Sequence, residues 1–410
     1  MRGTDDRQPS LFSAVADAYA GGEPISNAAL YQHLVERGAI TQSELQQRTA
    51  IGRSSKGHSL VKRKVRWIQQ TLRQLGLLER VPGQTGIWSV KKTQDVDGFQ
   101  IAPLNMVRVA FSTDMGLALW ADASVFRKLH LPFHLVLTSP PYPLSNPRSY
   151  GNPSPAQFTD FICDALEPLV RNLAAGGSIC LNLSNDIFLS RSPARSTYLE
   201  RLTIALEDRL GLQLMDRLVW HNPNKQPGPT HWACQQRIQL VHTYEPVLWF
   251  CNDPVRCLAD NRRVLQLHKP AQRLLMERGG ETRTATYGDG AYTLRPGSFG
   301  QETAGSIPRN VIPVSHDTLA TASLKKAVMA EGLPAHGALM PRTLASFLIR
   351  FLVPPGSRVI EPFGGWGTTI EQAELAGCEW IMTERVAQYL GAAAIRMKQA
   401  PGFHSHMAFN

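Results

Sequence analysis

Two loops that each follow a short apolar segment constrain the fold of this chain more than any other feature. The first loop, residues 138–142, reads Thr-Ser-Pro-Pro-Tyr and directly follows the continuous apolar run Phe133–Leu137. The second loop, residues 361–369, is rich in glycine and follows the strand candidate Arg358–Glu361. A continuous apolar run of this length is typical of a parallel strand buried on both faces of a sheet. Both loops are therefore expected at strand ends, where α/β sheets bind their ligands.

Strand and helix signals alternate from residue 107 onward. Apolar runs bounded by turn residues predict the strands Val107–Phe111, Leu117–Trp120, Phe133–Leu137, Ser178–Leu183, Leu212–Trp220, Pro246–Cys251, Arg358–Glu361 and Trp380–Met382. Helical periodicity predicts helices over residues 155–175, 198–210, 344–352, 368–376 and 386–398. The first of these helices is expected to end at Gly176-Gly177. The alternation indicates an α/β fold with a doubly wound sheet.

The first part of the chain, residues 1–97, has a different pattern. Its helix and strand signals are, in order, residues 10–20, a helix capped by Ser26, residues 59–74, Leu77–Val81 and Ile87–Val90. The last two segments flank the turn sequence Pro-Gly-Gln-Thr-Gly. Helices followed by a hairpin predict a winged helix-turn-helix domain.

Positive charge is concentrated in this N-terminal part. The formal net charge of the chain is +10, and residues 53–92 carry ten Lys or Arg against one acid, Glu79. Basic side chains that neutralise phosphates supply the sequence-independent part of DNA binding. The candidates for DNA contact are Lys62, Arg63, Lys64, Arg66, Arg237, Arg262 and Arg263. The alternative interpretations of the basic helix are a solvated face and a dimerisation surface.

The loop at residues 138–142 has the groups that an exocyclic amine of a nucleobase needs in order to react. Such an amine is a poor nucleophile because its lone pair is delocalised into the ring. The Ser139 hydroxyl and the Pro140 carbonyl can accept its two hydrogens. Pro140 and Pro141 fix the turn so that both acceptors converge, and Tyr142 can stack on the base. The alternative is a rigid surface turn, but the position directly after a buried strand favours catalysis.

The loop at residues 361–369 has the pattern of a site for a nucleoside-containing cofactor. Gly365 and Gly367 follow a strand, and Thr368 begins a helix whose first N–H groups are free for a ligand. The next strand ends at Glu384, about twenty residues beyond the loop, where a carboxylate can accept both ribose hydroxyls. A Gly-x-Gly pair alone is a weak signal. Strand, loop, helix, strand and acid in this order favour a cofactor site.

Composition disfavours several classes of protein. There is no run of eighteen apolar residues, and Met1–Asp6 lacks the apolar core of a signal peptide, so we expect a cytoplasmic protein without a membrane span. The six cysteines show no Cys-x-x-Cys pair, and we predict no metal site. No Pro-Cys dipeptide exists, which argues against methylation of a ring carbon through a cysteine nucleophile.

With these residues in view, the chain from Val107 to Leu390, roughly 70% of its length, resembles the permuted, β-class DNA amino-methyltransferases. It is especially similar to the PvuII-type DNA cytosine-N4 methyltransferases. Most methyltransferases place the cofactor loop before the target loop, whereas in the permuted enzymes, as here, the target loop comes first. The stretches that carry the resemblance are residues 120–124, 138–142, 192–198, 220–225, 306–310 and 335–341.

The resemblance implies a Rossmann-like S-adenosylmethionine-dependent methyltransferase fold with circularly permuted motif order, to which the N-terminal winged helix is an addition. It implies direct in-line transfer of a methyl group to the N4 amine of a cytosine flipped out of double-stranded DNA. Ser rather than Asp at position 139 favours cytosine N4 over adenine N6. The cofactor-binding residues that it implies are Asp122, Glu361, Phe363, Gly365, Gly367, Thr368 and Glu384.

The resemblance also divides the chain and suggests partners. The expected parts are the winged-helix domain (1–97), a linker (98–104), the catalytic half (105–252), a target recognition region (253–305) and the cofactor-binding half (306–410). The expected partners are double-stranded DNA, a cognate restriction endonuclease and a second copy of the chain. The expected location is the cytosol or nucleoid of a bacterium.

Two alternatives and three departures from the family pattern stay open. The alternatives are an adenine-N6 methyltransferase on the same fold and a non-enzymatic DNA-binding regulator with a degenerate fold. Asn182 stands where the PvuII-type pattern has an acid thought to partner the serine, so either Asp186 substitutes or no such relay is needed. Trp366 replaces a small residue, a change expected to reshape the methionine pocket, and Gly337 replaces a proline.

Overall fold

The computed structural model describes residues 10–19, 21–50, 57–75, 77–90, 101–104, 106–144, 153–316, 319–334 and 339–409. The chain forms two compact units, which are Met1–Leu258 with Val311–Asn410, and Ala259–Asn310. The second unit covers most of the segment expected to be the target recognition region. Gly337 and residues 98–100 of the expected linker lie outside the described residues.

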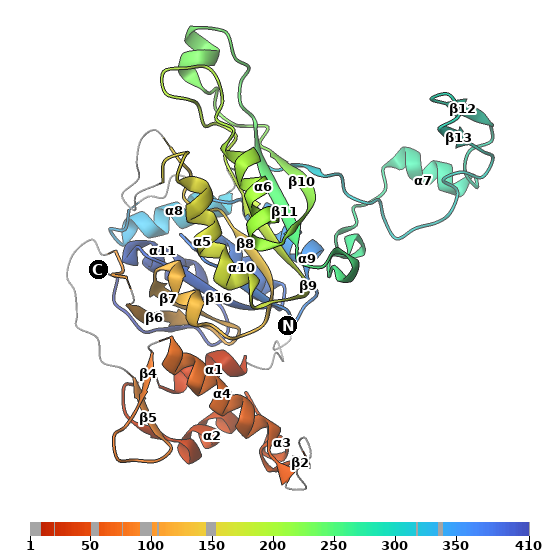
Figure 1. Ribbon diagram of the computed structural model, residues 1–410. Helices are drawn as coiled ribbons and strands as arrows, with labels where there is room; N and C mark the ends of the chain where they lie inside the picture. The colour runs from red at the N-terminus through yellow and green to blue at the C-terminus, as the bar shows by residue number, and fades with distance from the viewer. Residues whose placement is uncertain are drawn as a thin grey trace. The chain divides into compact units, whose positions relative to one another are not determined.

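The first unit is built on a ten-stranded mixed sheet (Figure 1). In the described residues its strand order is β14-β10-β11-β9-β8-β15-β16-β7-β6-β17. The strand bounds are β6 (Val107–Ser112), β7 (Gly116–Ala121), β8 (Phe133–Thr138), β9 (Leu173–Asn182), β10 (Gln213–His221), β11 (Tyr244–Cys251), β14 (Val311–Pro313), β15 (Arg358–Glu361), β16 (Glu379–Glu384) and β17 (His404–Ser405). The central strands β9, β8, β15, β16 and β7 are parallel to their neighbours in that series. All eight strands expected from the sequence are confirmed.

Helices connect the parallel strands. Their bounds are α5 (Phe158–Val170), α6 (Tyr198–Leu210), α8 (Leu319–Ala330), α9 (Arg342–Leu352), α10 (Thr368–Leu375) and α11 (Ala387–Met397). α5 connects β8 to β9 and α10 connects β15 to β16, while α6 packs against α5 and α9 against α10. These crossovers confirm the predicted α/β class. Within the described parts of the chain, every helix is too short or too polar to span a bilayer.

One predicted boundary is wrong. The helix expected to end at Gly176-Gly177 ends at Val170, and both glycines lie inside strand β9. Gly176 has a φ of +79°, and a Cβ built on it would lie 1.8 Å from the Arg256 carbonyl oxygen. A glycine inside a strand often marks such a close approach of another backbone segment. Gly176 therefore marks a contact with distant backbone and not a helix end.

Several elements were not expected from the sequence. They are α3 (Gln42–Gln46), α7 (Pro270–Glu277), α8, β1 (Ile25–Ser26), β2 (Thr49–Ala50), β3 (Gly57–His58), β12 (Ala285–Tyr287), β13 (Tyr292–Leu294), β14, β17 and the short helices η1 (Ala123–Lys128), η2 (Thr230–Gln235), η3 (Pro254–Arg256) and η4 (Asn261–Val264). Most of these elements are too short for a periodic pattern of apolar residues to be seen in the sequence. α8 is longer, but Val328 is its one buried residue, so it lacks the apolar stripe that identifies a helix in a sequence.

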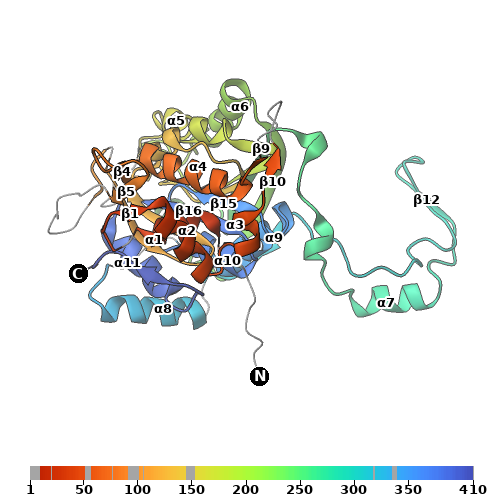
Figure 2. The ribbon, with the colours of Figure 1, turned by 90° about the horizontal axis from the view of Figure 1, so that it is seen from below.

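The N-terminal elements appear in the predicted order, helices first and a hairpin last. They are α1 (Leu11–Ala18), α2 (Asn27–Glu36), α4 (Leu60–Gln74), β4 (Leu78–Arg80) and β5 (Ile87–Val90), and β1, β5 and β4 form an antiparallel sheet. Ser26 caps α2 by accepting a hydrogen bond from Ala29 N, as predicted. Ser59 caps α4 in the same way through Lys62 N. Figure 2 shows these helices in front of the sheet.

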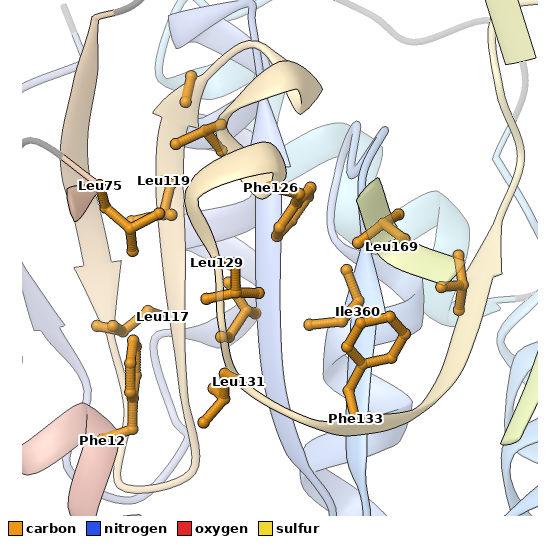
Figure 3. Packing of buried hydrophobic residues seen from close by; sticks show 14 of the residues in the cluster. Phe12, Leu75, Leu117, Leu119, Phe126, Leu129, Leu131, Phe133, Leu169 and Ile360 are labelled. Carbon is orange, nitrogen blue, oxygen red and sulfur yellow. The ribbon is translucent and has the colours of Figure 1, made fainter. Parts of the chain in front are cut away.

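Apolar side chains join the N-terminal elements to the edge of the large sheet. Phe12 of α1 and Leu75 after α4 belong to the same buried cluster as Leu117 and Leu119 of β7 (Figure 3). The cluster continues through the sheet to Ile360 of β15. The N-terminal elements are thus packed on the hairpin formed by β6 and β7.

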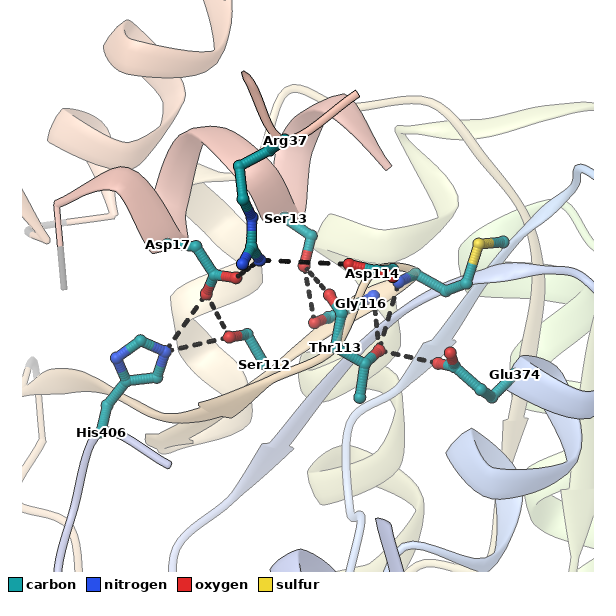
Figure 4. Close-up of polar contacts among 10 residues, drawn as sticks. Ser13, Asp17, Arg37, Ser112, Thr113, Asp114, Gly116, Glu374 and His406 are labelled. Atoms are coloured by element: carbon teal, nitrogen blue, oxygen red, sulfur yellow. Dashed lines mark hydrogen bonds and ion pairs between the residues drawn. The ribbon is translucent and has the colours of Figure 1, made fainter. Parts of the chain in front are cut away.

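Polar contacts reinforce this packing (Figure 4). Ser13 Oγ donates to the Thr113 carbonyl at 2.6 Å and lies 2.8 Å from the Gly116 carbonyl. Asp17, also on α1, accepts hydrogen bonds from Ser112 and from Arg37. His406 Nε2 lies 3.3 Å from Asp17 Oδ1 and so brings the C-terminal strand into the same group. Helix α1 therefore contacts both the turn between β6 and β7 and the residue that follows β17.

The second unit, Ala259–Asn310, contains η4, α7 and the antiparallel hairpin of β12 and β13. Its two ends are joined by a bridge between Gln266 and Ser306. His268 reinforces this bridge, because its ring nitrogens lie 2.9 Å from Ser306 Oγ and 3.0 Å from Thr303 Oγ1. Val264 and Leu294 are its buried apolar residues among those described, so this unit has a small core.

Candidate active site

The two loops singled out in the sequence lie at the same edge of the sheet. Strands β8 and β15 are parallel neighbours, with Leu135 opposite Val359 and Val136 opposite Ile360. From β8 the chain continues to β9 on one side, and from β15 it continues to β16 on the other side. In open α/β sheets, ligands bind at the carboxyl ends of strands where the order reverses in this way. Loops 138–142 and 361–369 both open into this crevice.

The carboxylate of Glu361 connects the two loops. It accepts a hydrogen bond from the Thr138 hydroxyl, which directly precedes Ser139. It also accepts from Phe363 N at 3.1 Å and from Thr369 Oγ1 at 2.7 Å. Burial raises the pKa of Glu361 to about 7 against the opposing effect of these three donors. Glu361 is 4% exposed, so its contacts hold the loops and leave it little surface for a ligand.

Glu384 holds the glycine-rich loop from the neighbouring strand. Its Oε2 accepts a hydrogen bond from Gly365 N and its Oε1 accepts one from Val386 N, both at 2.8 Å. Burial raises the pKa of Glu384, and the backbone donors oppose that shift. A carboxylate has about four acceptor positions, so these two bonds leave capacity for ligand hydroxyls. Its geometry is compatible with the predicted ribose contact.

A cavity of about 620 Å³ opens beside these loops. Its lining residues are Asp122, Ala123, Ser139, Pro140, Pro141, Tyr142, Leu144, Pro153, Gln157, Phe161, Ser184, Asp186, Lys225, Glu245, Pro362, Phe363, Gly365, Glu384, Arg385 and Tyr389. The volume lies in the range of cofactor sites, about 300–1,000 Å³. Phe363 faces Phe161 with ring centroids 5.6 Å apart. The aromatic rings of Phe161 and Phe363, the remaining acceptor positions of Glu384 and the backbone at Gly365 fit a nucleoside-containing cofactor.

Most predicted site residues meet at this cavity, but three do not line it. Those that line it are Ser139, Pro140, Pro141, Tyr142, Asp122, Phe363, Gly365 and Glu384. Glu361 points into the interior, as described above. Gly367 is the N-cap of α10 with a φ of +72°, and Thr368 is buried in the first turn of that helix. These three residues hold the glycine-rich loop from the side that faces the protein interior.

Trp366 does not line the cavity either. Its side chain is 1% exposed and packs in a separate apolar cluster with Val328, Leu333 and Tyr389. Arg396 Nε donates to the Trp366 carbonyl at 2.7 Å. The ring of Trp366 is packed against residues of α8 and α11, and Tyr389 of the same cluster lines the cavity, so the predicted effect on the methionine pocket stays a prediction that would act through Tyr389.

A second, smaller cavity of about 210 Å³ adjoins the first. Its lining residues are Ser139, Tyr142, Asn182, Trp220, Asn222, Lys225, Thr243, Tyr244, Glu245, His316, Leu339 and Met340. Ser139, Tyr142, Lys225 and Glu245 line both cavities. Ser139 Oγ lies 2.6 Å from the Tyr142 hydroxyl, so the two side chains form a hydrogen bond. Ser139 thus stands where a group in one cavity can meet a group in the other.

Glu245 of the smaller cavity is a functional candidate that the sequence analysis missed, and it contacts Asn182 and Lys225. Glu245 Oε2 accepts from Asn182 Nδ2 at 3.1 Å, and Glu245 Oε1 lies 3.6 Å from Lys225 Nζ. Asp186, named as a substitute acid, instead lies 3.6 Å from Arg195 and 3.8 Å from His242. The sequence feature that could have identified Glu245 is an acidic residue at the second position of the otherwise mostly apolar strand β11.

The predicted DNA-binding residues lie on three separate elements. Lys62, Arg63 and Arg66 of α4 line a polar groove together with Arg48, His58 and Ser59, and Lys64 is exposed on the same helix. Arg237 is exposed in the long connection between β10 and β11. Arg262 and Arg263 belong to the second unit, where Arg262 forms an ion pair with Asp260 at 2.8 Å.

Comparison with known proteins agrees with this geometry. Residues 133–394 match the N6_N4_Mtase family, described as DNA methylase. The Type II methyltransferase M.PvuII of Proteus hauseri is 29% identical over 262 residues, which cover 64% of this chain and 77% of that protein. The solved structure of the PvuII DNA methyltransferase (cytosine-N4-specific) aligns with a TM-score of 0.53 and 26% identity, covering 69% of this chain and 86% of that one.

The family match spans more than half of the chain and includes both loops. The strand order, the crevice between β8 and β15 and the cavity beside the glycine-rich loop are the structural counterparts of that match. The predicted methyltransferase fold and cofactor are confirmed. The chain therefore belongs to the N6_N4_Mtase family and is an S-adenosylmethionine-dependent DNA methyltransferase.

Proposed function

We propose that this protein methylates the N4 amine of a cytosine in a specific sequence of double-stranded DNA. The observation that carries the proposal is Ser139, which lies at the junction of a cofactor-sized cavity and a smaller, base-sized one. A serine at this position favours cytosine over adenine in the resembling enzymes. An amine inside a duplex cannot reach such a junction, so the base has to be flipped out.

The transfer step depends on orientation by the chain's own groups. S-adenosylmethionine supplies, when bound, a methyl group on a positively charged sulfur. Asp122, Phe363 and Glu384 are the residues proposed to hold its adenosine part in the larger cavity. Ser139 Oγ and the Pro140 carbonyl accept hydrogen bonds from the two N–H groups of the amine and turn the nitrogen lone pair toward the methyl group. The N–C bond forms as the S–C bond of the methyl donor breaks, and the amine releases one proton to solvent. Tyr142 stacks on the base, and no covalent enzyme intermediate forms.

DNA contact is proposed for the N-terminal domain, interpreted as a winged helix-turn-helix. Its α4 carries the exposed Lys64 and a groove lined by Lys62, Arg63 and Arg66. Base flipping costs a few kcal/mol, and phosphate contacts of this kind offset that cost. Arg237 is proposed as a further contact. The second unit, with Arg262 and Arg263, is proposed to read the target sequence.

The wider role proposed is modification in a restriction–modification system or chromosomal marking. A cognate restriction endonuclease and a second copy of this chain are the proposed protein partners. A chromosomal substrate places the activity in the bacterial cytosol or nucleoid.

The test is expression of the chain in a host free of DNA methylation, followed by mass spectrometry of hydrolysed nucleosides and single-molecule sequencing. N4-methylcytosine confined to one short motif is the expected result. N6-methyladenine instead would contradict the proposed base and keep the reaction. Soluble protein that binds the cofactor yet leaves DNA unmodified would favour the regulator alternative.

A further inference from the structure

The hydrogen-bonding capacity of Lys225 is only partly used by the protein. Its ammonium group has three N–H donors. One N–H is directed at His242 Nδ1, 3.0 Å away, and a second faces Glu245 Oε1, with which the ammonium group forms an ion pair at 3.6 Å. Burial and the adjacent Lys225 charge lower the pKa of His242 to about 4, so at neutral pH its ring is uncharged and Nδ1 accepts this bond. Within the described part of the chain, these contacts leave the third N–H for a ligand in the cavity.

Asn182 adds a second donor to the same cavity. A carboxylate only accepts hydrogen bonds, so the amide nitrogen of Asn182 has to be the atom that faces Glu245. That nitrogen carries two hydrogens, and Glu245 uses one of them. The position at which similar enzymes have an acid therefore presents a donor here, held in place by the acid on β11.

Glu245 is the anchor of both donors. Its two carboxylate oxygens are directed at Lys225 and Asn182, and its side chain is 18% exposed against 29% for Lys225. Burying the charges of an ion pair costs desolvation energy, and apolar side chains at the same positions would avoid that cost. Its position beside Ser139, in a cavity walled by Trp220 and His316 with ring centroids 6.2 Å apart, is consistent with recognition of a flat polar ligand.

The two donors match cytosine better than adenine. Beside its exocyclic amine, cytosine presents two acceptors in succession, the ring nitrogen N3 and the carbonyl O2. Adenine presents one acceptor, N1, and then a C–H group that cannot accept. A site built to hydrogen-bond one ligand can reject an analogue that lacks the bonded group by a factor of about 10⁴–10⁵, because its own buried polar groups are left unpaired.

We propose that Lys225 and Asn182 read the N3 and O2 acceptors of the flipped cytosine, and that Glu245 is the positioning residue that aims them. The inference rests on the proposed cytosine-N4 activity and deepens it, because it names the side chains that select the base. It also accounts for Asn182, which supplies a donor to the base in place of an acid to the serine.

The test is a Lys225→Met variant, which keeps an unbranched side chain only one atom shorter and removes the donors. Wild type and variant are incubated with S-adenosylmethionine and genomic DNA from a methylation-free host, and both methylated nucleosides are quantified. We expect kcat/KM for N4-methylcytosine formation to fall by about 10- to 100-fold, as for loss of one charge-assisted hydrogen bond. Cofactor binding, measured by calorimetry, should be unchanged. The ratio of N6-methyladenine to N4-methylcytosine should rise, which general loosening of the structure would not produce.

Lys128→Met is the matched control, because Lys128 is exposed and lines neither cavity. It should keep wild-type activity. If Lys225→Met methylates cytosine at the wild-type rate with an unchanged product ratio, the inference is overturned while the cytosine activity stands. If wild type forms only N6-methyladenine, the proposed function itself has failed, and this is read from the wild-type product alone.

A second variant tests the role of these donors in base selection if Lys225→Met loses cofactor binding. Asn182→Leu keeps the branched shape of the side chain and removes one donor without leaving a charge unpaired. We expect it to bind the cofactor, to methylate cytosine about tenfold more slowly and to form relatively more N6-methyladenine. Wild-type kinetics in this variant would contradict the inference.

Discussion

Glu361 is the residue that connects the two loops at the edge of the sheet. Its carboxylate accepts hydrogen bonds from Thr138 on one strand and from Phe363 and Thr369 on the other side of the crevice. A buried acceptor shared by three donors fixes the relative position of those donors, since each lost bond leaves a buried polar group unpaired, at about 1–3 kcal/mol. The position of Ser139 relative to the cofactor loop is therefore set by a residue that touches neither reacting group.

The ionisation of Glu361 should make stability depend on pH. Its pKa is raised to about 7 in the folded protein from 4.5, so its contribution is fully present below pH 4.5 and lost as pH rises through 7. Relative to Glu361→Gln, the free energy of unfolding of wild type should fall by on the order of 3 kcal/mol over this window. Urea unfolding of both proteins from pH 4 to pH 8 measures the difference. Parallel stability curves would contradict the prediction.

Ser139→Ala should separate chemistry from binding. Losing one acceptor for the amine should lower kcat by on the order of 10²–10³, the cost of removing one oriented hydrogen-bonding group at a reacting centre. The affinity for S-adenosylmethionine should stay at the wild-type value. Single-turnover methylation and calorimetry measure the two quantities, with Ser405→Ala, exposed on β17, as the matched control. Normal turnover of Ser139→Ala would remove the role assigned to this serine.

At the scale of elements, the turn from β15 into α10 contains two left-handed glycines, Gly365 and Gly367. Gly367 has a φ of +72°, and a Cβ there would lie 3.1 Å from the Ala393 side chain. Gly367→Val adds a β-branched side chain in a conformation that such residues avoid. We expect loss of cofactor binding in calorimetry. Gly356→Val is the control, because Gly356 also has a positive φ but has open space around it and lies outside the loop.

Helix α4 is the element with a testable electrostatic role. Replacing Lys62, Arg63 and Arg66 with Ala should weaken DNA binding to all sequences alike. If each contacts one phosphate, the slope of log K against log salt should become less steep by about 0.9 per residue. Fluorescence anisotropy on a DNA duplex at several salt concentrations measures this slope. Arg73→Ala, exposed at the end of the same helix, is the control, and an unchanged slope in the triple variant would favour the solvated-face interpretation.

At the scale of the whole molecule, the N-terminal elements and the methyltransferase sheet share one hydrophobic cluster. Phe12 packs with Leu117 and Leu119, and Asp17 ties α1 to Ser112 and His406. Two parts with a shared core unfold together. The N-terminal elements are therefore expected to unfold together with the sheet.

Phe12→Ala should accordingly destabilise the joint transition. We expect a loss of about 3–5 kcal/mol in the free energy of unfolding, as for other buried Phe to Ala changes. Urea unfolding followed by tryptophan fluorescence reports both parts, through Trp88 and Trp380. Leu60→Ala, at an exposed position, should change stability by less than about 0.5 kcal/mol. An early N-terminal transition in Phe12→Ala, with the main transition unmoved, would show that the parts are independent.

The sequence by itself determined the strands from residue 107 onward and the permuted order of the two loops, and it predicted Ser139, Gly365 and Glu384 as residues of one site, where they line the same cavity. These follow from local patterns, because an apolar run, a turn and a capping residue each act within a few positions of the chain. It failed at Gly176, where a contact with distant backbone gives glycine its role.

The tertiary structure alone decided which polar residues form the smaller cavity. Asn182, Lys225 and Glu245 lie on or beside β9, β10 and β11, and antiparallel pairing of these strands brings them together. The same is true of the inward turn of Trp366 and of the attachment of α1 to the sheet. Such contacts join residues far apart in the chain, and no local pattern of one sequence records them.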